Sequence, residues 1–230
     1  MARIKWGMFV TDGRGKVGGH VLTKTRSGAT VRTKVTPANP QTSYQGNVRG
    51  IFGSISRAWS ALTEAQRLTW QNATEAFTKT NVFGDSYKPS GKNLFTALNS
   101  NLLNINEPQI NVAPSVEEVA YIDFQTVSVS VATGQIAIDY SAVPLGGDFV
   151  LVLEASAPLS AGKYNFSGSY RKIGQWKSDE IPDDTAMFAM YVQKFGTPVV
   201  GKKIAFRIKA INYPSGQAGN YSSLDAIVGT

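Results

Sequence analysis

The hydrophobic residues of this chain recur with two different spacings, and the change between them limits the folds that the chain can adopt. Between about residues 43 and 105 they fall three and four positions apart, as on one face of a helix. From about residue 113 onward they fall at every second position, as in strands with one buried face. We therefore expect an α+β protein in which a short helical segment precedes a separate β domain.

Each helix predicted in this segment begins after a side chain that can cap it. An oxygen at such a position accepts a hydrogen bond from an otherwise unpaired backbone N–H of the first turn. The caps are Thr42 or Ser43 for the first helix, Thr63 in a capping-box pair with Gln66 for a second helix from Glu64, and Ser90 for the third.

Aromatic side chains on the apolar sides of these helices predict a small core cluster that anchors the segment. Trp59 and Trp70 lie eleven positions apart, on the first and second predicted helices, so we expect their cluster to join the two. The predicted structural anchor residues are Phe52, Trp59, Trp70 and Phe95.

Positive charge is concentrated at the N-terminus. The first 70 residues hold eleven basic and two acidic side chains, a net charge of +9, whereas the remaining 160 have a net charge of −2. Such asymmetry predicts an acidic partner, either nucleic acid or an acidic groove on another subunit. The predicted partner-binding residues are Arg3, Lys5, Trp6, Arg14, Lys16, Lys24, Arg26, Arg32 and Lys34.

These residues lie in an extended basic β arm, residues 1–42. Apolar and basic side chains alternate over residues 3–10, with Val10 as the last apolar member, and a long Gly-rich turn follows. Further strands are predicted over His20–Thr25 and Ala29–Val35, before Pro37 and Pro40 keep the chain extended. A ribbon of two or three short strands is marginally stable alone, so we expect the arm to need a neighbouring surface.

The β domain has the pattern of an immunoglobulin-like or fibronectin-III-like sandwich. About seven short strands separated by Gly, Pro, Asn and Ser turns fill about 115 residues. The predicted division is a β arm at 1–42, a helical anchor segment at 43–105, a linker at 106–112 and a β-sandwich at 113–230. The strand candidates are 127–131, 136–140, Asp148–Ser156, Lys163–Ile173, Ala186–Lys194, Lys202–Asn212 and Ser222–Val228.

The motifs that could indicate an enzyme lack the context that their chemistry requires. Gly13, Gly15 and Gly18 match GxGxxG, but β-like residues follow where a dinucleotide site needs a helix and a later acid. His20 is the only histidine and there is no cysteine, so neither a hydrolase triad nor a His/Cys zinc site is expected. We expect no catalytic residue, cofactor or metal.

The acidic stretch near residue 180 admits a structural and a functional interpretation. The acidic stretch from Lys177 to Asp184 lacks the spacing of a calcium loop, so we interpret it as a solvated loop that contains Asp179 and Glu180.

No apolar run approaches the about 18 residues of a membrane helix, and the N-terminus lacks a signal-peptide core. A glycan-binding module would need exposed aromatic residues. The candidate cluster in this sequence is Tyr164, Phe166, Tyr170 and Trp176.

The residues of the helical segment resemble a group of small proteins encoded by tailed bacteriophages and prophages. In that group a Gly-rich basic β arm precedes an NPxT…Q…R…F…W…LT…QR…W segment and an SGxNLF-type helix. The resemblance covers about residues 13–100, and the β domain is similar only in general style. The matching residues are Asn39–Thr42, Gln45, Arg49, Phe52, Trp59, Leu62, Thr63, Gln66, Arg67, Trp70, Ser90–Phe95 and Asn99.

The resemblance implies a non-enzymatic virion protein, made in the host cytoplasm and assembled into the particle. The expected role is head-associated, as a minor capsid, decoration or head–neck protein that binds coat, portal or neck subunits through its arm in many copies. Two alternatives stay open: a tail or connector protein, and a virion protein that contacts DNA nonspecifically through the basic arm.

Overall fold

The structure is a computed structural model that describes residues 2–8, 12–36, 39, 41–119, 121–141, 148–177 and 180–230. It is an α+β protein whose chain divides into two compact units. Unit 1 comprises residues 1–100 and 109–116, and unit 2 comprises residues 101–108 and 117–230. The expectations for Val10, Pro37, Pro40 and Asp179 lie outside the described residues.

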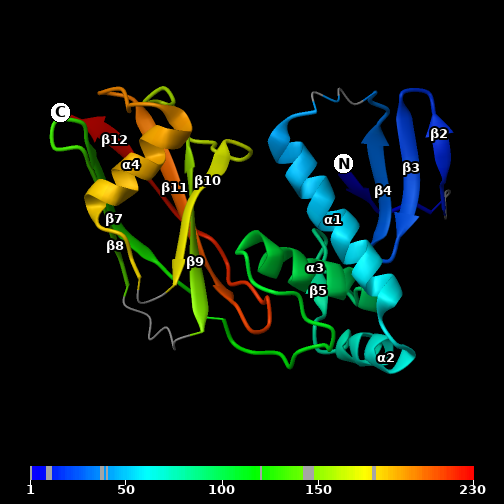
Figure 1. The fold of residues 1–230 in the computed structure, drawn as a ribbon. Helices are drawn as coiled ribbons and strands as arrows, with labels where there is room; N and C mark the ends of the chain where they lie inside the picture. The colour runs from blue at the N-terminus through cyan, green and yellow to red at the C-terminus, as the bar shows by residue number, and fades with distance from the viewer. Residues whose placement is uncertain are drawn as a thin grey trace. The chain divides into compact units, whose positions relative to one another are not determined.

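Unit 1 begins with a four-stranded antiparallel sheet, the N-terminal sheet (Figure 1). Its strands are β1 (Ala2–Ile4), β2 (Gly15–Val17), β3 (His20–Thr25) and β4 (Gly28–Thr33), in the order β1-β4-β3-β2. The strand predicted over His20–Thr25 is confirmed, and the one predicted from Ala29 begins one residue earlier. Strand β2 lies inside the predicted Gly-rich turn, where positive φ angles at Gly15 and Gly18 fit the turns around it.

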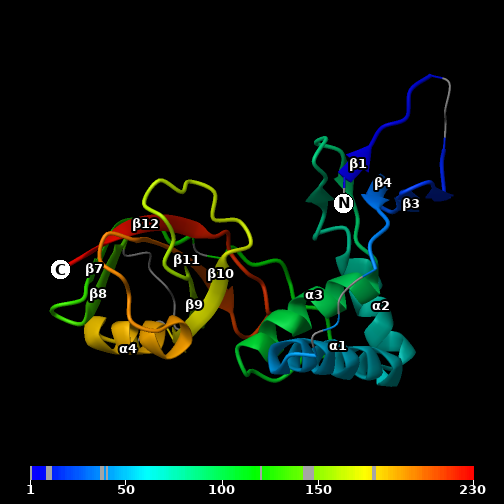
Figure 2. The same ribbon diagram turned by 90° about the horizontal axis from the view of Figure 1, so that it is seen from above.

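Three helices and a short hairpin complete unit 1 (Figure 2). Thr42, Thr63 and Ser90 each accept a hydrogen bond from the backbone N–H three residues on, and the predicted capping box of Thr63 with Gln66 is present. The predicted helix starts are therefore confirmed. The elements are α1 (Ser43–Ala61), α2 (Glu64–Ala73), β5 (Lys79–Thr80), β6 (Ser86–Tyr87) and α3 (Gly91–Asn104), the last of which ends in unit 2.

Unit 2 is β-rich and sandwich-like, with one helix. Six strands follow the hydrogen-bonded order β10-β9-β11-β12-β7-β8, and every pair is antiparallel except β12 with β7. Side chains of these strands and of the helix form one core, in which Leu153, Ile204 and Phe206 are fully buried. The elements are β7 (Phe124–Ser130), β8 (Gln135–Tyr140), β9 (Phe149–Ser156), β10 (Tyr170–Lys177), α4 (Asp184–Phe195), β11 (Lys203–Asn212) and β12 (Ser222–Gly229).

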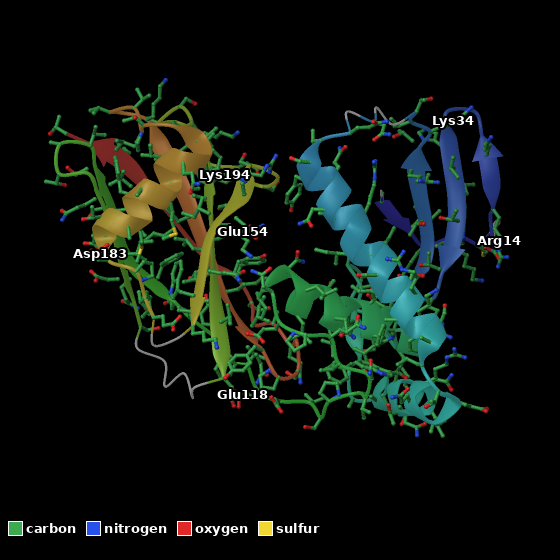
Figure 3. All side chains as sticks on the ribbon, viewed as in Figure 1. Arg14, Lys34, Glu118, Glu154, Asp183 and Lys194 are labelled. Carbon is green, nitrogen blue, oxygen red and sulfur yellow. The ribbon has the colours of Figure 1, made fainter. Side chains whose placement is uncertain are left out.

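The strand predicted over Ala186–Lys194 is wrong, because these residues form helix α4. Asp183 caps the helix by accepting a hydrogen bond from the Ala186 N–H at 2.7 Å, and Lys194 lies in its last turn (Figure 3). The negative charge of Asp183 at the N-terminus of the helix and the positive charge of Lys194 at its C-terminus both interact favourably with the helix dipole. Met187 and Tyr191, four positions apart, are the residues that the helix buries.

The strand predicted over Lys163–Ile173 is wrong in its first part. Residues 163 and 169 donate backbone hydrogen bonds to the third residue before them, as in turns, and Gly168 has a φ of 80° that favours glycine. Strand β10 therefore begins only at Tyr170 and continues to Lys177.

Candidate protein-binding surface of the N-terminal sheet

The cross-strand register distributes the predicted partner-binding residues over both faces of the N-terminal sheet. Lys16 on β2 and Arg32 on β4 both pair with Val21, so their side chains share one face, and Arg3 on β1 has the same parity. Lys24 lies on the other face, because it pairs with Ala29, the partner of Ile4. The basic residues of the arm therefore do not form one continuous surface.

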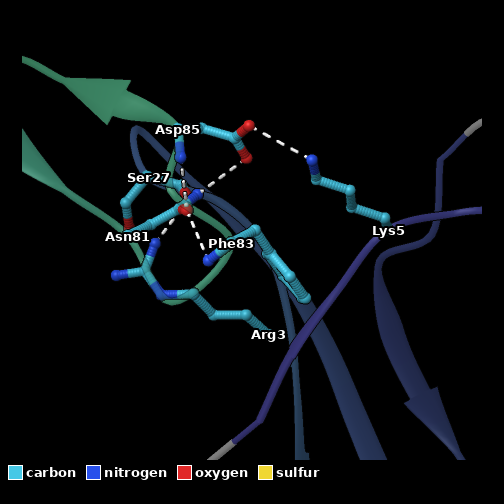
Figure 4. A network of polar contacts seen from close by, with 6 residues as sticks. All are labelled: Arg3, Lys5, Ser27, Asn81, Phe83 and Asp85. Carbon is cyan, nitrogen blue, oxygen red and sulfur yellow. Dashed lines mark hydrogen bonds and ion pairs between the residues drawn. The ribbon is translucent and has the colours of Figure 1, made fainter.

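Two of these residues contact the β5–β6 hairpin (Figure 4). Lys5 Nζ forms an ion pair with Asp85 at 3.1 Å. The Arg3 guanidinium donates to the Ser27 carbonyl, which also accepts from the Asn81 side chain at 3.3 Å. The hydrogen bond from Asn81, followed by Lys5, lowers the pKa of Asp85 below its usual range. Part of the arm is thus fixed by residues of its own chain.

A second acidic side chain, Asp12, holds two more of the predicted residues. Its carboxylate lies 3.5 Å from Lys24 Nζ and 3.9 Å from Arg14 Nε. A hydrogen bond from the Gly13 backbone N–H, and then the charge of Lys24, lower the pKa of Asp12. These exposed pairs orient the residues but contribute little free energy.

Lys16, Arg32 and Lys34 have no carboxylate partner within the described residues. They lie at the same end of the sheet, because Lys16 and Arg32 both pair with Val21 beside the β2–β3 turn, and the Lys34 N–H donates to the Gly19 carbonyl in that turn. Neighbouring strands are separated by about 4.8 Å, so Lys16 and Arg32, two strands apart, have their backbones about 10 Å apart. This end of the sheet presents three solvated cations.

Trp6 has a structural environment that explains a nearby glycine. A Cβ at Gly13 would lie 2.7 Å from the Trp6 ring, closer than packed atoms allow, and Leu22 is the next neighbour. Glycine therefore serves here for close approach of the Trp6 ring. The Trp6 Nε1–H is buried without an acceptor in the described part of the chain.

Two hollows border the contact between the N-terminal sheet and the hairpin. The first, of about 610 Å³, is lined by Trp6, Phe83 and Asp85 among others, and its two lysines, Lys5 and Lys24, are the ones paired with Asp85 and Asp12. The second, of about 640 Å³, lies against Thr30 and the start of α3. None of its basic residues pairs with a carboxylate of the described residues.

Phe95 contacts two of the other predicted anchor residues, Trp59 and Trp70. Its ring lies 5.3 Å from that of Trp59 and 5.1 Å, edge-on, from that of Trp70. The Trp70 Nε1–H donates to the Asn111 carbonyl at 2.9 Å, which satisfies the buried indole. The cluster predicted around the two tryptophans is therefore present. Phe52 lies outside it, with 51% of its surface exposed.

The aromatic residues predicted to form a glycan-binding cluster are not all exposed. Trp176 is buried in the core of unit 2, Tyr164 is exposed beside Lys203, and Tyr170 stacks on Arg207. No three acidic, His or Cys side chains within the described ranges meet as a metal site requires, and Asp183 serves as a helix cap. None of the helices in the described chain is long and apolar enough to cross a membrane.

A charged cluster on the solvent side of β11 escaped the sequence analysis. Arg207 forms an ion pair with Glu154 and lies between the rings of Tyr170 and Tyr221, 4.4 and 4.1 Å from their centroids. Burial, with the charge of Glu154, raises the pKa of Tyr221 to about 12. Arg207 and Lys209 alternate with the inward Phe206 and Ile208, so the pattern placed both cations opposite the core.

No protein-family model, no curated protein and no solved structure matches this chain.

Proposed function

We propose that the chain is a non-enzymatic structural component of a tailed-bacteriophage particle, associated with the head, which binds neighbouring subunits through its N-terminal sheet. The observation that carries the proposal is the end of that sheet where Lys16, Arg32 and Lys34 are solvated without carboxylate partners in the described chain. The resemblance of residues 13–100 to phage virion proteins supports the same assignment.

Strand addition gives this surface a physical means of binding. Within the part of the chain that the structure describes, β2 is an edge strand whose three residues are all exposed, so the backbone groups on its outer side are open to a further strand. Main-chain hydrogen bonds to β2 supply affinity that depends little on side chains, and Lys16 beside them favours an acidic partner strand. Coat, portal or neck subunits are the partners that we propose.

For unit 2 we propose an immunoglobulin-like or fibronectin-III-like module that serves as a spacer. The adjacency of β9, β11 and β12 matches strands C, F and G of such a domain, and the β7–β8 pair matches A and B. Helix α4 packs beside β8, where strand E would pair. An experimental structure in which α4 and β8 lay on different sides of the core would contradict this relationship.

The test of the main proposal is incorporation into particles purified from the virus or induced prophage that encodes the chain. We expect Lys16→Glu/Arg32→Glu/Lys34→Glu to be absent from particles, because its charge repels the acidic partner. The matched control, Lys163→Glu/Lys194→Glu/Lys202→Glu, changes the charge equally in unit 2 and should be incorporated normally. Equal copy numbers of the two variants, measured by quantitative mass spectrometry, would refute the proposal.

The same three cations favour a second candidate, nonspecific contact with packaged DNA. Phosphate binding releases counterions, so the logarithm of the affinity falls with the logarithm of salt by about 0.9 per phosphate contacted. For a surface of three cations, a slope of about −2 to −3 for a double-stranded oligonucleotide would support DNA contact. A flat response in wild type would remove this candidate and leave the first.

A further inference from the structure

The second hollow of unit 1 is lined by both apolar and polar side chains. It lies between one face of the N-terminal sheet, the β5–β6 hairpin and the start of α3, with a volume of about 640 Å³. Thr30 and Leu94 are almost fully buried at its base, whereas Val82 on its wall is 85% exposed. Pockets of about 300–1,000 Å³ bury most of the surface of a drug-sized ligand. An apolar side chain therefore finds both room and a partner surface here.

The rim of this hollow is positive without compensation. Arg3, Arg26 and Lys79 line it, and no acidic residue of the described ranges does. Arg3 and Arg26 donate to backbone carbonyls, the second of them to Pro89 at 3.4 Å, and none of the three pairs with a carboxylate of the described chain. The first hollow differs, because its lysines are paired with Asp12 and Asp85. Charge complementarity thus selects an acidic occupant for the second hollow.

The same chain carries a segment with the complementary chemistry. Unit 1 has fourteen basic and four acidic residues, a net charge of +10, whereas unit 2 has nine and twelve, a net charge of −3. Within unit 2, Glu180–Asp184 reads Glu-Ile-Pro-Asp-Asp, with Glu180 exposed and 43% of Ile181 exposed. Asp183 has an extended backbone, with φ −69° and ψ 167°, and Pro182 before it restricts the chain further.

We infer that the second hollow of one copy receives the Glu180–Asp184 segment of another copy. Ile181 fills the apolar part beside Val82 and Phe83, while the Glu180 and Asp184 carboxylates pair with the basic rim. The four residues Glu180–Asp183 precede helix α4 and span at most about 14 Å, which is the scale of a short peptide laid across one hollow. The inference rests on the proposed function, in which the chain assembles in many copies. It deepens that function by identifying a segment that binds to the hollow beside the arm.

The symmetry of such a contact follows from its two sides. The hollow and the segment are different surfaces, so the interface is heterologous: after one contact, one copy keeps its segment free and the other keeps its hollow free. Repetition of the contact closes a ring when the rotation allows and otherwise makes an open filament. Either outcome is a multi-copy assembly, as a virion structural protein needs.

Sedimentation velocity of the full-length chain tests the inference. Wild type should associate beyond a dimer at low salt, and more weakly at high salt. Arg26→Gln/Lys79→Gln removes two positive charges from the rim of the hollow, and Glu180→Gln/Asp184→Asn removes two negative charges from the segment while keeping the Asp183 cap. Each variant alone should be monomeric at concentrations where wild type associates. An equal mixture should form a 1:1 dimer and nothing larger, because only one functional hollow and one functional segment remain.

The matched control is Arg49→Gln/Arg57→Gln, which neutralises two exposed charges of α1 that do not line the hollow and should still associate. Circular dichroism establishes that every variant is folded. The inference is overturned if wild type is monomeric, if the mixture stays monomeric, or if the hollow variant loses oligonucleotide binding and nothing else. When wild type is monomeric but the Lys16/Arg32/Lys34 variant is still lost from particles, the inference fails and the proposed function stands.

Discussion

Phe95 is the side chain on which the packing of unit 1 converges. It is fully buried, and two indole rings lie against it from α1 and α2. We expect Phe95→Ala to lower the free energy of unfolding by about 3–5 kcal/mol, because the buried ring is lost and a cavity is left. Urea titration followed by tryptophan fluorescence measures the change.

Phe52→Ala provides the matched control, since it removes the same ring from a half-exposed position of α1. Its cost should lie within about 0.5 kcal/mol, as for other surface substitutions. Similar costs for the two variants would mean that the Trp59–Phe95–Trp70 cluster is not the core of unit 1.

The raised pKa of Tyr221 predicts how the stability of unit 2 depends on pH. Burial and the nearby Glu154 carboxylate disfavour the phenolate, so its pKa of about 12 exceeds the ordinary value of 10. The folded state therefore holds this proton between pH 10 and 12 while the unfolded state loses it, and stability falls as the pH rises through that range. In absorbance titrations at 295 nm, the difference between wild type and Tyr221→Phe should centre near pH 12. A centre near pH 10 would contradict the packing of Tyr221 against Arg207 and Glu154.

At this scale, the sequence predicted the tryptophan cluster because a 3.6-residue period places both rings on apolar helix faces. It could not separate Phe52 from Trp59, which lie on the same face of α1. The helical period gives the direction in which a side chain points. Whether Phe52 or Trp59 is buried depends on where α2 and α3 pack against α1. The Arg207 cluster was missed for a related reason, since its partners come from strands far apart in the chain.

Helix α1 contains three glycines that its own unit does not explain. Gly46, Gly50 and Gly53 are exposed, and a Cβ at any of them would meet nothing within 4 Å. Glycine in a helix costs about 0.5–1 kcal/mol relative to alanine. We therefore expect Gly50→Ala to raise the free energy of unfolding by about that amount, measured by ellipticity at 222 nm in urea.

Gly91→Ala is the contrasting variant at the start of α3. There a Cβ would lie 3.1 Å from the Gln71 amide nitrogen and 3.2 Å from the Trp70 carbonyl carbon, both backbone atoms. The same substitution should stabilise at Gly50 and fail to do so at Gly91. A gain of equal size at both positions would show that α2 and α3 pack less closely than described.

Helix starts were predictable because a cap is a local interaction between residues three apart, as at Thr63 and Gln66. Helix α4 was not, because Ala186–Lys194 is apolar enough for either a strand or a buried helix. Its identity depends on the Asp183 cap and on the core site that Met187 and Tyr191 fill, which β8 and β10 help to form. A short apolar run does not determine its own conformation without that context.

At the scale of the whole molecule, the two units divide the chain in a way that periodicity does not reveal. Residues 101–108 belong to unit 2, although 101–104 continue α3. Ile105 is buried, the Asn104 carbonyl accepts from Lys172 at 2.7 Å, and the Ile105 carbonyl accepts from Gln175 at 2.9 Å. Strand β10 is therefore supported by residues that the sequence assigned to the helical segment and linker.

This arrangement predicts the shortest stable form of unit 2. A fragment of residues 101–230 should unfold cooperatively, whereas 113–230, the β domain expected from the sequence, loses Ile105 and both hydrogen bonds to β10. Deleting a buried isoleucine costs about 2–5 kcal/mol, so the shorter fragment should be less stable by at least about 2 kcal/mol in urea. Ile105→Ala within 101–230 should reproduce most of that loss, which separates the side chain from the chain end. Equal midpoints for the two fragments would place residues 101–108 outside unit 2, and the division of the molecule would have to be redrawn.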